Sequence, residues 1–180
     1  MEKEIPIKEL VKLKQLFKST EIISDNFIEK IHFKVLHADL SNQRLVLINN
    51  DAFRELDANL IDTMMEKNEL KDLNENIFSN FSNLKSIALN RNQLESIPKS
   101  IFTKLTNLTD IDLSNNHLKS LDKQVFNDLC CLTILSLNDN QLTQLDKNIF
   151  NGLAKLETIQ LSNNQIKTIP VELFRGEILI

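Results

Sequence analysis

The sequence has no tryptophan and no tyrosine, and its 180 residues include only two glycines and three prolines. Two isolated glycines, Gly152 and Gly176, cannot form the glycine-rich loop that holds a nucleotide phosphate. The three histidines, His32, His37 and His117, lack companion ligands at the spacings of metal sites. The sequence therefore predicts no catalytic group, no metal site and no cofactor, and we expect a protein that is not an enzyme.

Basic residues are too few for a protein that binds nucleic acid. The formal net charge is −4 and the isoelectric point is about 5.4, whereas phosphate binding needs a basic surface. No apolar run approaches the length of a membrane span. The start of the chain is acidic and interrupted, unlike a secretory leader. We therefore expect neither nucleic acid nor a membrane as the partner.

Cysteine is equally scarce, since Cys130 and Cys131 are the only two and are adjacent in the sequence. A disulfide between neighbouring residues forms only with strain, and disulfides belong mainly to oxidising compartments. A cysteine nucleophile would need a base beside it, and the pattern assigns none. We therefore expect two free thiols and a cytoplasmic location.

Two rows of residues recur every 24 positions. One row consists of Asn68, Asn92, Asn116, Asn140 and Asn164; the other consists of Phe78, Phe102, Phe126, Phe150 and Phe174. Two independent rows at one spacing indicate a repeat architecture. A single unit cannot bury its apolar residues alone, whereas stacked units share a continuous core.

The repeat beginning at Leu84 shows what each position does. Apolar residues occupy positions 1, 4, 6, 11, 14, 19 and 22, counted from Leu84. Positions 3 to 7 alternate apolar and polar residues, which predicts a half-buried strand in each repeat. The asparagine at position 9 has both a donor and an acceptor, so a buried row can satisfy the backbone at the turns. We expect the phenylalanine at position 19 to pack the convex side.

The pattern L-x-x-L-x-L-x-x-N-x-L, with F-x-x-L on the convex side, resembles the leucine-rich repeat family from Val35 to Ile180. The resemblance implies an α/β solenoid with parallel strands on the concave face. The absence of cysteine clusters makes the chain similar to the small leucine-rich repeat effectors that intracellular bacterial pathogens deliver into host cells. That likeness implies a location in the host cytoplasm and the binding or inhibition of an enzyme or a ubiquitin-pathway partner.

The chain divides into residues 1–34, predicted as a short helical cap at the N-terminal end, and residues 35–180, predicted as six repeats in one continuous solenoid. A lysine-rich membrane helix is the alternative for the cap, but acidic residues interrupt it. The first repeat has Gln43 in place of the asparagine, and Thr63 is polar at an inward strand position of the second. No polar cover follows the last repeat, so we expect the stack to continue or to be closed by a partner or a second copy.

Partner binding is expected on the outward side of the strand row, at positions 3, 5, 7 and 8 of each repeat. We call this surface the concave face. Asp110 and Asp112 lie on one strand and suit a basic group of a partner; a calcium site there would lack further oxygen ligands. Met64 and Ile134 are apolar at outward positions and are candidate contacts. The predicted partner-binding residues are Asp39, Asp62, Met64, Glu66, Lys67, Arg91, Asp110, Asp112, Ile134, Ser136, Asp139 and Gln160.

Six of these residues are acidic and two are basic, so we expect a protein partner with a basic or mixed-charge surface. The predicted function is that of a non-catalytic protein-binding module that uses an acidic concave face. Three alternatives stay open. The first is that the concave face is merely solvated. The second is that the chain is the substrate-targeting part of a larger, ubiquitin ligase-like enzyme, and the third is that it is an extracellular innate-immune recognition domain.

Overall fold

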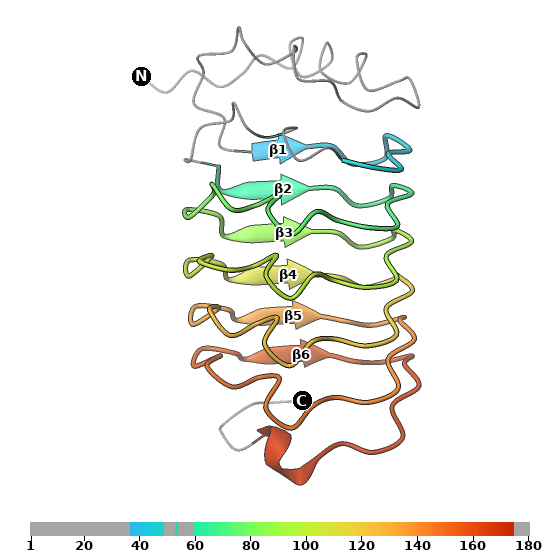
Figure 1. The fold of residues 1–180 in the computed structure, drawn as a ribbon, viewed down its shortest axis with the longest axis vertical. Helices are drawn as coiled ribbons and strands as arrows, with labels where there is room; N and C mark the ends of the chain where they lie inside the picture. Colours follow the sequence, from blue (N-terminus) through green and yellow to red (C-terminus); the bar gives the residue numbers. More distant parts are fainter. Residues whose placement is uncertain (1–36, 49–52, 54–59, 175–180) are drawn as a thin grey trace, which may run out of the picture.

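Six short parallel strands lie in chain order down one side of a coil (Figure 1). The computed structural model describes residues 37–48, 53 and 60–174. The strands are β1 (His37–Asp39), β2 (Asp62–Met64), β3 (Ser86–Ala88), β4 (Asp110–Asp112), β5 (Ile134–Ser136) and β6 (Thr158–Gln160), and a 3-10 helix follows at Val171–Phe174. Neighbouring strands pair one repeat apart, as in Ile87 with Ile111. The predicted α/β repeat solenoid is therefore confirmed.

The strands occupy positions 3 to 5 of each repeat, fewer than the predicted 3 to 7. Pairing nevertheless continues beyond their ends, because Leu89 N–H donates to the Asp112 carbonyl at 2.8 Å and Arg91 N–H donates to the Ser114 carbonyl at 2.9 Å. The central strand residue points into the coil in every inner repeat. The buried central residue of each of these strands thus lies beside that of the next strand.

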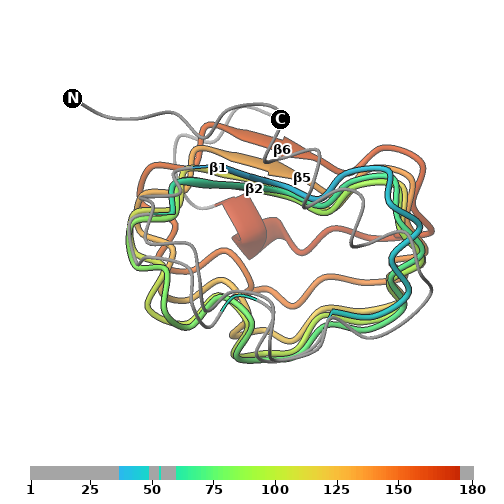
Figure 2. The same cartoon turned by 90° about the horizontal axis from the view of Figure 1, so that it is seen from above.

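Seen along the stack, the coil has the strands on one side and irregular segments on the other (Figure 2). The predicted phenylalanine row is buried there: Phe102 and Phe126 are 1% and 0% exposed, and their rings stack with centroids 6.1 Å apart. A second row at position 18, not anticipated from the sequence, is also buried and consists of Ile77, Ile101, Val125 and Ile149. The position-18 row therefore adds to the packing of the convex side by the predicted phenylalanine row. The side chain of Phe174 lies outside the described residues.

The asparagine row is buried and bonded as predicted. Asn116 Nδ2 donates to the carbonyls of Leu89 and Leu113, both at 3.1 Å, and its Oδ1 accepts the Leu94 N–H at 3.0 Å. The side chain therefore joins two repeats through groups that water cannot reach. In the first repeat, Gln43 Nε2 donates instead to the Ser41 carbonyl at 2.7 Å.

The residue at position 8, just before each row asparagine, turns the chain in a left-handed conformation. Its φ lies between 54° and 57° in all six repeats, at Asn42, Lys67, Arg91, Asn115, Asp139 and Asn163. Asparagine and aspartate adopt this conformation more readily than other non-glycine residues. This explains why the repeat turns without glycine, and it marks Lys67 and Arg91 as exceptions.

Thr63 is 0% exposed, and its Oγ1 has no hydrogen-bond partner among the described residues. The predicted cap at residues 1–34 and the end of the chain at residues 175–180 lie outside the described residues, so the division into cap and repeats stays a prediction. Within the described part of the chain, no helix is both long enough and apolar enough to cross a membrane.

Candidate partner-binding face

The outward residues of β2 to β5 form a flat, partly exposed row of side chains. Ser86, Ala88, Asp110 and Asp112 are each half-buried by their neighbours on the sheet. Ile134 at the start of β5 is 40% exposed. It lies between Asp110 and Thr158 in the strand register. The sheet thus brings the predicted contact residues of adjacent repeats onto one surface.

Two aspartates of this face are bound to their own turns. Asp112 Oδ1 accepts the Ser114 N–H at 2.9 Å, and Asp39 Oδ1 accepts both the N–H and the hydroxyl of Ser41, at 3.0 and 2.6 Å. An aspartate that binds the backbone two residues ahead stabilises a turn. The sequence pattern that indicates these turns is Asp-Leu-Ser, which occurs in both repeats.

Three further acids also have donors inside the chain. His37 Nδ1 lies 2.6 Å from Asp62 Oδ2, and the Thr109 hydroxyl donates to Asp110 Oδ2 at 2.6 Å. Asn163 Nδ2 donates to Asp139 Oδ1 at 2.7 Å. These carboxylates therefore help to hold neighbouring residues and repeats together, beyond any role in binding a partner.

The face over the last two repeats is likewise bonded internally. Gln160 Oε1 accepts the Ser136 hydroxyl at 3.2 Å and Asn138 Nδ2 at 2.9 Å, while Asn138 Oδ1 accepts the Ser162 N–H at 2.9 Å. Ser136 and Gln160, both predicted contacts, are therefore members of one polar network across β5 and β6. A partner would compete with that network for them.

Three charged residues of the face have no such partner. Lys67 and Arg91 are exposed and take part in no ion pair or side-chain hydrogen bond within the described part of the chain. Glu66 is half-buried, and its Oε2 is buried without a hydrogen-bond donor. The free, accessible charges are thus cationic, although the face as a whole carries more acidic than basic residues.

Away from this face, the reactive groups include two adjacent cysteines and a lysine. Cys130 is exposed and Cys131 half-buried, and both are free thiols, as expected. Lys155 Nζ lies 3.7 Å from Cys131 Sγ. The described residues contain no group of three or more His, Cys, Asp or Glu side chains that could hold a metal ion.

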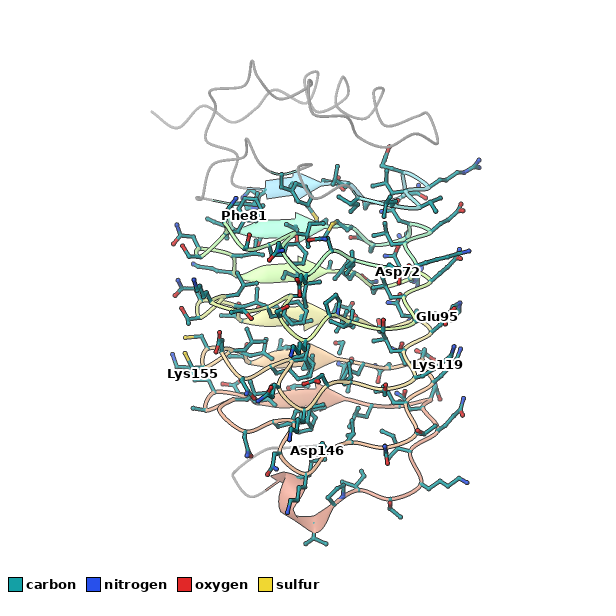
Figure 3. All side chains as sticks on the ribbon, in the orientation of Figure 1. Asp72, Phe81, Glu95, Lys119, Asp146 and Lys155 are labelled. Carbon is teal, nitrogen blue, oxygen red and sulfur yellow. The ribbon has the colours of Figure 1, made fainter. Side chains whose placement is uncertain are left out.

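The ion pair between Glu95 and Lys119 lies at one edge of the stack (Figure 3). Lys119 Nζ donates to Glu95 Oε2 at 2.8 Å, and this hydrogen bond with the nearby charge lowers the pKa of the Glu95 carboxyl. Both side chains are 61% exposed, so solvent screens the pair. It ties two repeats at the surface and is separate from the concave face.

The sequence matches the BspA type leucine-rich repeat region over residues 20–140 and 46–179. No curated protein matches the chain. Among solved structures, the APL1 leucine-rich repeat domain is similar at 23% identity with a TM-score of 0.72, over 86% of this chain and 42% of that domain.

Two receptor structures also match. The TLR13–ssRNA13 complex is 25% identical with a TM-score of 0.63, over 81% of this chain and 24% of that one. The Toll–Spatzle complex from Drosophila is 23% identical with a TM-score of 0.52, over 76% of this chain and 24% of that one. The chain therefore spans between a quarter and two fifths of the length of these structures. The likenesses below 25% identity concern the fold.

Proposed function

The chain belongs to the BspA-type leucine-rich repeat family, and from this premise we propose that it is a non-catalytic module that binds a protein partner through its concave face. The family and fold fit a recognition role, since the similar structures include one receptor in complex with Spatzle and another with single-stranded RNA. The fold alone does not name a partner, because repeat solenoids host many functions.

The observation that carries the proposal is the exposed Ile134 within a rigidly paired sheet. It is 40% exposed on β5, beside the short side chain of Thr158 on β6 and two residues before Ser136 on its own strand. Small neighbours allow another backbone to approach closely, and an exposed apolar residue in such a setting is a typical contact point. The sheet is held by successive parallel pairings, so these residues are positioned before the partner arrives.

We further propose a reducing compartment as the site of action, because both cysteines are free. The extracellular receptor-like alternative draws on the likeness to TLR13 and Toll. The effector role and the role as targeting part of a larger enzyme remain extensions of the same binding function.

The test is affinity capture with three versions of the chain. Ala88→Arg with Ile134→Arg places two long cations on the concave face, where neither side chain has a hydrogen bond to lose. Thr103→Arg with Ala154→Arg makes the same charge change at exposed positions outside that face. Thermal unfolding of both variants checks that the fold is kept.

A protein retained by the unaltered chain and by the Thr103/Ala154 version, but lost by the Ala88/Ile134 version, supports binding through the concave face. A protein retained equally by all three would contradict it, and the binding surface would then lie outside the concave face.

A further inference from the structure

The two free cations of the concave face, Lys67 and Arg91, occupy the same position in neighbouring repeats. Lys67 follows β2 and Arg91 follows β3, and the strands pair in register from Asp62 with Ser86 onward. The Lys67 N–H donates to the Asn90 carbonyl at 3.0 Å, which keeps the two turns side by side. Paired strands lie about 5 Å apart. The two side chains therefore start close enough together to reach one carboxylate.

Both residues adopt a backbone conformation that their side chains disfavour. At φ of 56° and 57° they are left-handed, a conformation that is costly for residues other than glycine, asparagine and aspartate. Arg44 and Lys104 are the other such residues among those described, but neither lies at position 8. Every other position-8 residue is an asparagine or aspartate: Asn42, Asn115, Asp139 and Asn163. Unfavourable backbone conformations of this kind cluster at binding sites.

The surrounding charges select the kind of anion that can bind. Glu66 directly precedes Lys67, and Asp62, Asp110 and Asp112 lie on β2 and β4, so a long polyanion such as RNA would be repelled by these acids. A segment with one carboxylate followed by a basic group would instead complement both the cation pair and the nearby acids. Asp112 lies one strand over and three positions back from Arg91, or roughly 11 Å away at ordinary strand spacings.

We propose that Lys67 and Arg91 together bind a carboxylate of the protein partner, in a segment that carries a lysine or arginine four residues away, which faces Asp112. This inference rests on the proposed function and refines it, because it names the chemistry of the partner's contacting segment. Four residues of extended chain span up to about 13 Å, and side chains four residues apart point to the same face, which fits the separation of the two subsites.

The probe is the peptide acetyl-Glu-Ala-Ala-Ala-Lys-amide, compared with the same peptide carrying glutamine in place of glutamate. Each is titrated to millimolar concentration while the backbone amide signals of Lys67 and Arg91 are followed by NMR. The variant Lys67→Asn with Arg91→Asn removes both cations and installs the residue that other repeats use at this position. Lys99→Asn with Lys123→Asn is the control, since it makes the same charge change at two exposed positions outside the concave face.

The glutamate peptide should shift both amide signals and bind about three- to tenfold more tightly than the glutamine peptide, as expected for exposed charge-assisted contacts. This preference should persist in the Lys99/Lys123 variant and vanish in the Lys67/Arg91 variant. The midpoint of thermal unfolding of the Lys67/Arg91 variant should not fall, because asparagine fits the turn, so lost binding cannot be attributed to unfolding.

Three results would overturn the inference. They are no shift with the glutamate peptide, a preference that survives in the Lys67/Arg91 variant, and single-stranded RNA that binds through the same two residues at physiological salt. The protein-binding function itself is judged separately by the capture experiment with Ala88 and Ile134. The two failures can therefore be told apart.

Discussion

Replacement of Asn116 by alanine tests whether the buried asparagine row holds the turns of the solenoid. Asn116 is 4% exposed, and its side chain makes bonds to both its own repeat and the preceding one. The Leu94 N–H donates only to Asn116 Oδ1, at 3.0 Å, among the contacts of the described residues. In the alanine variant this buried donor has no acceptor, which costs about 1–3 kcal/mol.

The two carbonyl groups that accept from Asn116 lose less stabilisation than the Leu94 N–H, because each also accepts a second side-chain amide. The Leu89 carbonyl also accepts Asn92 Nδ2 at 3.0 Å, and the Leu113 carbonyl also accepts Asn140 Nδ2 at 3.0 Å. Each carbonyl would keep one donor, so each lost bond costs about 0.5 kcal/mol, near the lower end for a hydrogen bond. The expected decrease in the free energy of unfolding is therefore about 2–4 kcal/mol.

Asn164→Ala is the matched control, since it removes the same side chain at the same repeat position near the end of the stack. Asn164 accepts the Leu142 N–H at 3.0 Å but is itself only half-buried. Water can replace part of what is lost, so the expected cost is smaller, about 1 kcal/mol. The difference between the two variants isolates the effect of burial.

The assay is urea unfolding followed by far-UV circular dichroism, because the chain has no tryptophan or tyrosine for intrinsic fluorescence. The denaturant slope should stay the same in both variants; a changed slope would signal that repeats unfold separately, as repeat proteins can. The Leu94 amide should also exchange its hydrogen faster in the Asn116 variant. Equal losses in the two variants, or a loss below about 0.5 kcal/mol for Asn116, would refute a buried row that satisfies the backbone.

Three further outcomes are expected. Thr63→Val should raise the free energy of unfolding by about 1 kcal/mol, because the buried hydroxyl has no partner; a loss in the same urea titration would reveal a bond to that hydroxyl. Gly152→Ala should lower the free energy of unfolding by about 1–2 kcal/mol, since Gly152 has φ of +90° and the new Cβ would lie 3.1 Å from the Asn127 carbonyl oxygen. The same thermal unfolding midpoint for the variant and the unaltered chain would contradict this. The lowered pKa of Glu95 means that its ion pair with Lys119 stabilises the fold above the carboxyl's unfolded pKa, and that this stabilisation is lost as pH falls. Because solvent screens this exposed pair, the effect is small. Glu95→Gln should therefore leave the pH dependence of the thermal unfolding midpoint unchanged.

Much of the architecture could be predicted from the sequence because the same pattern of residue types recurs in each repeat. The 24-residue spacing of Asn92 and Asn116, and of Phe102 and Phe126, predicts which residues stack, and the alternation around Ile87 predicts the strand. The predicted burial of these residues is confirmed. Periodicity succeeds here because the partner of each residue is its own equivalent in the next repeat.

The concave face was predicted less completely, because composition counts charges without their partners. The aspartates appeared free in the sequence, yet Asp112 caps its own turn, and Asp62 and Asp110 bind His37 and Thr109. The role of these twelve predicted residues in partner binding stays a prediction. What the structure adds is which of them are already engaged within the chain.

The sequence by itself determined the period, the inward and outward positions, and the rows that fill the core, since these depend on side-chain type at fixed spacing. Only the tertiary structure decided that position 8 is left-handed and that Lys67 and Arg91 are the exposed cations of the concave face without a partner among the described residues. The physical reason is that a backbone angle or an ion pair depends on atoms of the neighbouring repeat. Their distances are set only when the strands pair and the turns stack.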